Sequence, residues 1–327
     1  MDNVSFFSRV WVFLKKPIVS LILRVAVGGL LLAYLIKLSA FTEIARAFSR
    51  IDPLYLFAFF LFYFLSVSLV SLRWKVLLKT WDIEQRFIVL LRIIMTGLFL
   101  NNFLPGSLGG DAYRLYAGGR DTGKLEDVAA TIFYERILSY GSLVTLGLFA
   151  LSMRPHHAQD WLFWLILVGA LFGLLTLSSL SSLPIFERWT NAITTRYVFV
   201  QRLHLNNWLQ SFRFKIRHPG MLAGVFLISL FIQFLDVFCF RLVASAIQLP
   251  VKLTDLLLFV PLLYLAILLP LSINGIGIRE SVFVIFSASW GITSADAVAF
   301  SLTVFALNLA GSLIGGVIYW FDRPTGK

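Results

Sequence analysis

Two stretches of the sequence, about half a chain apart, repeat one another. Residues 104–114 read LPGSLGGDAYR, and residues 269–279 read LPLSINGIGIR. They align without a gap, and leucine, proline, serine, glycine and arginine recur at the same spacing that separates Pro105 from Pro270. Because proline and glycine interrupt helices, each stretch breaks the apolar run that leads into it. We interpret the two stretches as one structural element present twice in an internal duplication.

The composition around these breaks is that of a membrane protein. Of the 327 residues, 59% are hydrophobic and 14% are charged, against about 25% charged in an ordinary soluble domain. Runs long enough to cross a bilayer occupy residues 18–38, 53–72, 128–153, 161–180, 221–247 and 295–321. Two shorter runs, 87–104 and 256–271, end in the proline and glycine breaks. The sequence therefore predicts an all-α polytopic membrane protein with about six spanning helices and two re-entrant, broken hairpins, and it excludes a cytosolic enzyme.

The duplication also predicts how the chain is organised. We expect a single membrane domain over residues 1–327, with one pseudo-repeat at about 15–153 and a second at about 160–322. Each pseudo-repeat has three crossings and one hairpin, and an odd number of crossings inserts the second repeat upside down relative to the first. Inverted repeats with broken helices near the midplane are typical of secondary transporters, and their paired interruptions indicate the binding site.

The charge balance predicts the orientation of the chain. Lys and Arg number 28 and Asp and Glu 17, which gives a formal net charge of +11. In a polytopic membrane protein such a surplus gathers on cytoplasmic loops and favours anionic lipid headgroups, so no nucleic-acid partner is expected. We expect the basic loop 183–219 and both termini in the cytoplasm, in the inner membrane of a bacterium.

The candidate site surrounds the two breaks. Broken backbone is tolerated at membrane depth only where it is buried in protein or lines a watery cavity, and free N–H groups at helix starts attract phosphate. An arginine beside them suits the same anion. The predicted headgroup residues are Asn101, Asn102, Pro105, Ser107, Gly109, Gly110, Asp111 and Arg114, with Ser272, Asn274, Gly275, Gly277, Arg279 and Glu280. The alternative for the broken backbone is a turn that only packs helices together. The alternative for the charged residues is that Asp111–Arg114 and Arg279–Glu280 are salt bridges that only fix the hairpins.

Further charged residues lie within the apolar helices. They are Arg73, Glu135, Arg136, Asp236 and Arg241. Ionisable groups in the membrane are costly unless paired, so these five either pair between helices or carry a coupling ion or proton. The four histidines have no acidic partner at the spacing of metal ligands. We expect no metal site, no cofactor and no catalytic motif.

Residues 101–114, NNFLPGSLGGDAYR, resemble the transmembrane region of lysylphosphatidylglycerol synthases, a family of flippase-like membrane proteins. Arg73-Trp74, Glu135-Arg136 and residues 275–280 resemble its other marks, and the likeness spans nearly the whole chain. The resemblance implies translocation of a phosphate-bearing or aminoacylated lipid between leaflets. In the full synthases an aminoacyl-transfer domain follows the membrane part. This chain is expected to be a stand-alone member without that domain.

Three functions stay open from the sequence. The first is a translocase for a membrane phospholipid or a polyprenyl-phosphate lipid. The second is a membrane enzyme, such as a glycosyltransferase with a polyprenyl-phosphate-linked donor, in which Asp111 or Glu280 acts as the base. The third is an accessory subunit beside a lipid-modifying enzyme partner.

Overall fold

The structure is a computed structural model that describes residues 52–102, 108–153, 168, 219–268 and 277–321. Over these ranges its secondary structure is helical throughout, as the composition predicts. The predicted crossings at 18–38 and 161–180 lie outside the described residues, and so does nearly all of the basic loop 183–219. The prediction of an all-α membrane fold is thus confirmed on the helices that flank both breaks.

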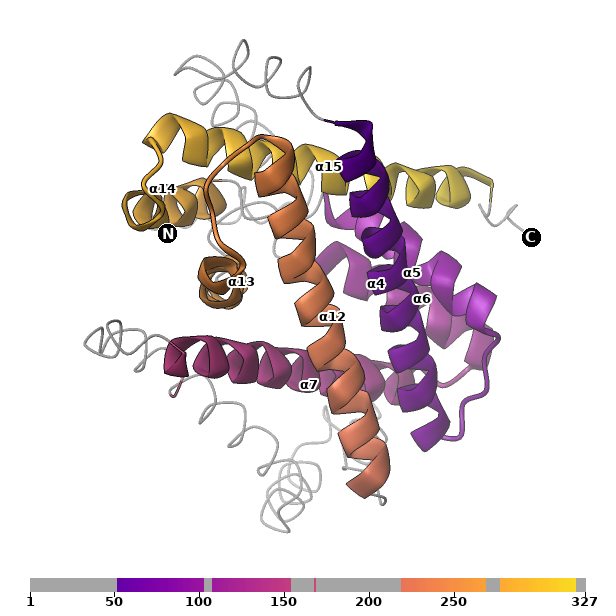
Figure 1. Ribbon diagram of the computed structural model, residues 1–327. Coiled ribbons are helices and arrows are strands. Elements are labelled where there is room, and N and C mark those ends of the chain that lie inside the picture. The colour runs from indigo at the N-terminus through magenta and orange to yellow at the C-terminus, as the bar shows by residue number, and fades with distance from the viewer. Residues whose placement is uncertain (1–51, 103–107, 154–167, 169–218, 269–276, 322–327) are drawn as a thin grey trace, which may run out of the picture.

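The helices of the described part form two sets of four (Figure 1). The first set is α4 (Pro53–Thr80), α5 (Phe87–Asn101), α6 (Leu108–Thr122) and α7 (Leu125–Ser152). The second set is α12 (Pro219–Ala246), α13 (Leu253–Ile267), α14 (Ile278–Trp290) and α15 (Ser294–Phe321). Helix lengths follow the same order in both sets, with 28, 15, 15 and 28 residues in the first and 28, 15, 13 and 28 in the second.

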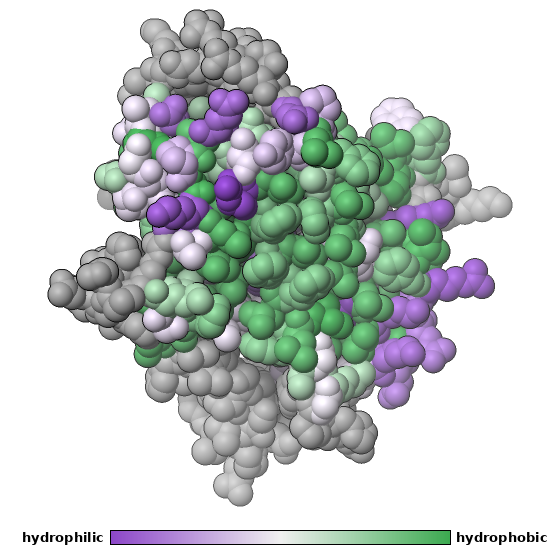
Figure 2. Space-filling view, in the orientation of Figure 1, coloured by the Kyte–Doolittle hydropathy of each residue, from purple (hydrophilic) through white to green (hydrophobic). Residues whose placement is uncertain are grey.

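Three helices of the described part are long and apolar enough to cross a membrane, namely α4, residues Ala223–Ala246 of α12, and α15. Large apolar side chains are exposed along α4 at helical spacing: Leu54, Phe57, Leu61, Leu65 and Leu72. Figure 2 shows a broad hydrophobic face where α4 and α12 lie in Figure 1, with hydrophilic residues gathered beyond it. Lipid can cover such a face but water cannot do so without cost. The protein is therefore an integral membrane protein.

The shorter apolar helices α5 and α13 correspond to the predicted half-crossings. Each has 15 residues, which at 1.5 Å per residue is about 22 Å, short of the roughly 30 Å of a hydrocarbon core. Helix α7 has the length of a crossing, but Glu135 and Arg136 lie within it. Re-entry of α5 and α13, and the crossing at 128–153, stay predictions.

Helix packing is the same in the two sets. When α4 is exchanged with α12, α5 with α13, α6 with α14 and α7 with α15, every helix pair in contact becomes another pair in contact. Helix α5 packs on α15, for example, and α13 packs on α7, while α4 and α12 pack on each other. In Figure 1, α15 and α7 lie at opposite edges with α4 and α12 between them. The described helices are thus related by an approximate two-fold exchange.

The turns that end the first helix of each set are also alike. Asp82 and Gln248 are the non-glycine residues of the described part with positive φ, 54° and 59°, and each lies shortly after its helix, α4 or α12. After each, a backbone N–H returns to the helix, from Ile83 to the Leu78 carbonyl over 3.1 Å and from Leu249 to the Ala244 carbonyl over 2.8 Å. Such a left-handed residue closes a helix by satisfying its last carbonyls. The equivalence therefore extends to backbone conformation.

Helices α4 and α12 run antiparallel through the centre. The Ser66 hydroxyl donates to Asp236 Oδ1 over 3.2 Å, and Arg73 Nη1 donates to the Ser229 hydroxyl over 3.0 Å. From Ser66 to Arg73 the residue number rises along α4, whereas the number of the residue contacted on α12 falls from 236 to 229. Beside this pair, a cluster of buried aromatic side chains fills the second set, and it includes Phe240, Phe259, Phe283, Trp290 and Phe300.

Glycine allows α15 to approach α5 closely. A Cβ atom on Gly315 would lie 1.9 Å from the carbonyl oxygen of Met95, so no larger residue fits this backbone position. Gly311 lies one turn earlier against the ring of Tyr63. Small residues four apart are a common device for close packing of membrane helices. This contact fixes α5, and with it the first break, against the second set.

Candidate functional site

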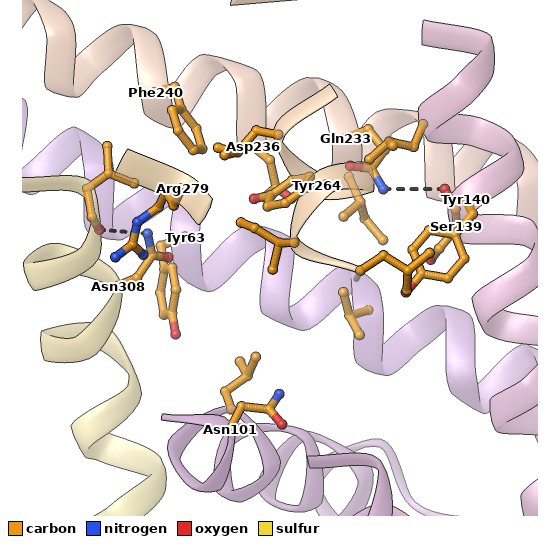
Figure 3. A pocket seen from close by; sticks show the side chains of 18 of the residues that line it. Tyr63, Asn101, Ser139, Tyr140, Gln233, Asp236, Phe240, Tyr264, Arg279 and Asn308 are labelled. Carbon is orange, nitrogen blue, oxygen red and sulfur yellow. Dashed lines mark hydrogen bonds between the residues drawn. The ribbon is translucent and has the colours of Figure 1, made fainter. Parts of the chain in front are cut away.

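A cavity of about 400 Å³ lies between the two sets of helices. Three arginines and one carboxylate line it: Arg73, Arg136, Arg279 and Asp236. Hydroxyl and amide groups complete the polar part of its wall, among them Tyr63, Asn101, Ser139, Tyr140, Tyr264 and Asn308. Figure 3 shows Asp236 beside Tyr264, with Asn101 on the opposite side of the cavity. A volume of this size can hold a lipid headgroup.

The lining positions of the two sets correspond. Positions 98, 101 and 102, at the end of α5, correspond to 264, 267 and 268, at the end of α13, with the same spacing as Asp82 and Gln248. Positions 136, 139 and 143 of α7 correspond to 305, 308 and 312 of α15 when the two helices are aligned at their first residues, Leu125 and Ser294. All of them line the cavity. It therefore lies where the two sets meet, with one backbone framework on both sides and different side chains.

Glu135 joins two arginines in the first set. Its side chain is buried, Arg73 Nη2 donates to Oε1 over 2.6 Å, and Arg114 Nη2 donates to Oε2. The Arg114 guanidinium also lies 4.3 Å from the ring centroid of Trp74. A buried carboxylate between two guanidinium groups is tolerable because each charge is matched and hydrogen-bonded. The pairing is between helices, as one of the two sequence interpretations has it.

Asp111 holds the third arginine of this cluster. Arg136 Nε and Nη2 donate to Asp111 Oδ2 over 2.8 and 2.6 Å, while Arg114 reaches Oδ1 only over 3.4 Å. The salt bridge expected between Asp111 and Arg114 is thus the weaker one. The Arg136 side chain is 36% exposed, whereas those of Arg73 and Arg114 are 5% and 9% exposed. Arg136 is therefore the cation of the cluster that a bound molecule can reach.

The arginine cluster, which is Arg73, Asp111, Arg114, Glu135 and Arg136, surrounds a second cavity of about 200 Å³. Three guanidinium groups and two carboxylates give it a formal charge of +1. Arg73 Nε and Arg114 Nε are buried and have no hydrogen-bond partner among the described residues. A buried donor without a partner is costly. The cluster thus retains a formal positive charge and two donors without a partner among the described residues.

The second break carries a tighter arrangement. Arg279 Nε and Nη2 donate to Glu280 Oε1 over 3.2 and 3.0 Å, and the Ser301 hydroxyl donates to the same oxygen over 3.1 Å. The other oxygen accepts the Gly277 N–H over 2.6 Å, which caps the start of α14. Gly277 has a φ of 89°, a conformation that glycine adopts readily. Both oxygens of Glu280 are thus engaged in holding Arg279 and the helix start.

Asp236 has a different environment. Its partners among the described residues are neutral: the Ser66 hydroxyl at 3.2 Å and the side chain of Tyr264. No described cation forms an ion pair with it, and Arg241 donates to the Ser245 hydroxyl instead. Arg241 lies outside the residues that line the cavity. Of Asp236 and Arg241, the acidic and the basic residue of α12, only Asp236 therefore belongs to the site.

The asparagines before the first break fasten α5 to its neighbours. The Gly110 N–H donates to Asn101 Oδ1 over 2.6 Å, and Asn102 Nδ2 donates to the Ser312 hydroxyl over 2.9 Å. A Cβ atom on Gly110 would lie 2.8 Å from the Gly97 carbonyl oxygen, so α6 approaches α5 as backbone on backbone. These contacts position the break and leave the Asn101 amide at the cavity wall.

Most of the predicted residues that the structure describes lie around the two cavities. Gly109 is buried in the first turn of α6. Outside the described residues are Pro105, Ser107, Ser272, Asn274 and Gly275. The sequence does not single out the hydroxyl residues that line the cavity, Tyr63, Ser139, Tyr140 and Tyr264, or Ser66, which donates to Asp236. Their signal was a lone hydroxyl within an apolar helix, which is common and therefore weak.

Comparison with known proteins identifies the family. Residues 21–316 match the lysylphosphatidylglycerol synthase transmembrane region. The chain belongs to this family. The match includes both breaks and all the described residues of the site, so the resemblance seen in residues 101–114 is confirmed.

Relatives of the same kind occur in other organisms. A UPF0104 membrane protein of Methanothermobacter thermautotrophicus is 24% identical over 340 residues, which cover 95% of each chain. UPF0104 membrane proteins of Pyrococcus horikoshii and Methanocaldococcus jannaschii are each 27% identical over 131 residues, which cover 39% of both chains in the first case and 38% in the second. The names of all three relatives describe them as membrane proteins.

Proposed function

We propose that this protein moves a phosphate-bearing lipid, or an aminoacylated form of one, between the leaflets of the membrane. The observation that carries the proposal is the cavity between two matched sets of membrane helices, lined by Arg73, Arg136 and Arg279. Arginines at membrane depth are costly and mark substrate pathways. A lipid phosphate matches their charge and their hydrogen-bonding geometry.

The first contact with the headgroup is assigned to Arg136. Its guanidinium is the most accessible of the cluster, lines both cavities, and is held in place by Asp111. Behind it, the unused Nε donors of Arg73 and Arg114 and the net charge of +1 favour an anion over a neutral headgroup. The acyl chains stay outside the cavity, where the exposed surface of α4 and α12 is apolar.

The arrangement of helices supports an inverted repeat and alternating access. Helices α4 and α12 are antiparallel and both are candidate spans. An axis that exchanges two antiparallel spanning helices lies across them, in the plane of the membrane, which is the symmetry of inverted-repeat transporters. Opening the cavity first on one side and then on the other requires only that one set rocks against its counterpart.

The enzyme interpretation requires a carboxylate that is free to act as a base. Glu280 accepts hydrogen bonds at both oxygens, and Asp111 is held by two donors of Arg136. Neither Asp111 nor Glu280, the two bases that the sequence suggests, is free, which favours the translocase over an enzyme that uses either of them. An accessory subunit, in contrast, predicts that the purified protein moves no lipid.

The test is a proteoliposome assay that follows fluorescent phosphatidylglycerol and a fluorescent polyprenyl phosphate between leaflets. We expect protein-dependent movement of at least one lipid, and Arg136→Gln to slow it by about ten- to a hundred-fold, because a charge-assisted hydrogen bond is lost. The matched control is Arg120→Gln, which removes an exposed arginine that is also paired with an aspartate, Asp121, outside both cavities. Movement that persists in Arg136→Gln, or stops equally in Arg120→Gln, would contradict the proposal.

The orientation of the chain is proposed with the function. With both termini and the basic loop 183–219 in the cytoplasm of a bacterial cell, the turn before α5 faces the cytoplasm and the turn before α13 faces the outside. Arg86 and Lys252 are exposed, equivalent N-cap residues of α5 and α13. In a Cys239→Ala background, Arg86→Cys should react with an impermeant thiol reagent only from inside, and Lys252→Cys only from outside. Labelling of both from one side would refute the inverted repeat.

A further inference from the structure

Among the described carboxylates near the cavities, Asp236 alone lacks a cation. Asp111, Glu135 and Glu280 each accept hydrogen bonds from at least one arginine. Asp236 lines the main cavity and is bonded instead to the Ser66 hydroxyl and to Tyr264. An ionised carboxylate removed from water without a counterion is unfavourable, and it takes up a proton instead. This residue can therefore exist in two protonation states within the site.

Nearby charges neither neutralise Asp236 nor substitute for it. On α4, Arg73 attracts it but already donates to Glu135 and Ser229, and Tyr63 is neutral. On α7 the ionisable groups at the cavity are Arg136, paired with Asp111, and Tyr140.

The remaining elements add few ionisable groups. Helix α13 contributes Tyr264, α14 contributes Arg279, which is held by Glu280, and α12 itself contributes Cys239. The described cavity-lining residues of α15 carry no ionisable group, and Asn308 is among them. Asp236 is thus the carboxylate on which a proton can be gained or lost without breaking an ion pair.

We propose that Asp236 is a proton-binding site that couples lipid movement to a proton gradient, with the anionic lipid and the proton carried together. The proposal rests on the translocase function proposed above. A phosphate in the cavity and an ionised Asp236 repel each other. Protonation of Asp236 removes this repulsion, so the bound proton strengthens binding of the lipid anion, and by reciprocal linkage the bound lipid anion strengthens binding of the proton. A lipid phosphate with one negative charge then crosses together with one proton, which leaves the loaded site without added charge.

The arrangement of the two sets supports this role. The position equivalent to Asp236 in the first set, at the spacing that relates positions 98 and 264, is Val70, which lines the cavity as well. The carboxylate is therefore not required by the shared framework of the two sets. The fixed positive charge lies in the first set, and the site for the proton faces it from the second.

The sign of the pH effect follows from the linkage. Binding of a short-chain phosphatidylglycerol to the purified protein should weaken as the pH rises through the range in which Asp236 loses its proton, up to about ten-fold per pH unit for one proton. Asp236→Asn keeps the size of the side chain and resembles the protonated state. We expect this variant to bind the lipid equally well between about pH 6 and pH 9, because its side chain has no proton to lose.

The decisive experiment measures lipid movement in proteoliposomes with and without an imposed pH gradient. In the native protein the gradient should drive fluorescent phosphatidylglycerol towards the alkaline side, with proton influx recorded by an enclosed pH dye. Asp236→Asn should still move lipid but should respond neither to the gradient nor with proton flux. The control is Asp121→Asn, an exposed carboxylate outside both cavities, which should behave as the native protein.

The outcomes separate this inference from the function on which it rests. Native protein that moves lipid at a rate independent of the gradient would overturn the proton site and leave the translocase standing. So would an Asp236→Asn variant that keeps the gradient response. Native protein that moves no lipid at all would overturn both proposals.

Discussion

The two sets of helices have one framework and opposite electrostatic designs. In the first set, Glu135 is clamped between Arg73 and Arg114, and Asp111 holds Arg136. In the second set, Asp236 faces the same cavity with neutral hydroxyl partners only. The two sets thus share backbone positions and differ in the side chains that these positions carry. The first side of the cavity carries only charge that is fixed by pairing, while the second carries, besides the paired Arg279, a charge that a proton can remove.

The difference explains why helix geometry alone does not locate the function. Positions 98 and 264 are equivalent and both line the cavity, yet one is a leucine and the other a tyrosine. The framework provides the space between the sets, and the side chains decide what can enter it. Substitutions at the two kinds of carboxylate should therefore have very different effects on stability.

The largest effect is expected for Glu135→Gln. The change leaves two buried guanidinium groups facing each other without their shared counterion, and breaking a buried pair costs about 3–5 kcal/mol. Thermal unfolding of the purified protein in detergent, followed by circular dichroism or intrinsic fluorescence, should show a clearly lowered midpoint. Lipid movement should be lost with it, because Arg114 and Arg73 lose the group that positions them.

The counterpart in the second set should behave differently. Asp236→Asn removes no ion pair, and its amide can still accept from Ser66, so stability should change by less than about 1 kcal/mol. If Asp236→Asn were as destabilising as Glu135→Gln, the contrast between paired and unpaired carboxylates would be wrong. In that case Asp236 would belong to an essential ionic contact, and the proton site would lose its basis.

The sequence predicted the framework more completely than the partners within it. The breaks at Pro105 and Pro270, the half-chain distance between them and the apolar runs predict two matching sets of helices, because glycine, proline and hydrophobic length are local signals. Which arginine pairs with which carboxylate is not local. Glu135 and Arg136 are neighbours in the chain, but successive side chains on a helix point about 100° apart. Glu135 therefore pairs with Arg73 on α4 and Arg114 on α6, while Arg136 pairs with Asp111 in the first turn of α6.

Asp236 shows the same limit on the other side of the cavity. From the sequence, Arg241 is a nearby partner on the same helix, yet residues five apart lie on different faces. The hydroxyl groups that hydrogen-bond to Asp236 come from Ser66 on α4, far earlier in the chain, and from Tyr264 on α13. Such contacts depend on how α4 packs against α12 and α13, which no local pattern encodes.

A third comparison tests whether the two sets are alike at single-residue level. Gly123 and Gly291 follow α6 and α14, have φ angles of 66° and 67°, and have no atom within 4 Å of an added Cβ. Alanine at either position meets only the intrinsic cost of a left-handed conformation, about 1 kcal/mol. Gly123→Ala and Gly291→Ala should therefore lower the stability in detergent equally, within about 0.5 kcal/mol. Gly220→Ala, at a helical glycine with equally open surroundings, should cause no loss. Unequal losses would mean that the backbone equivalence of α6 and α14 ends before their last turns.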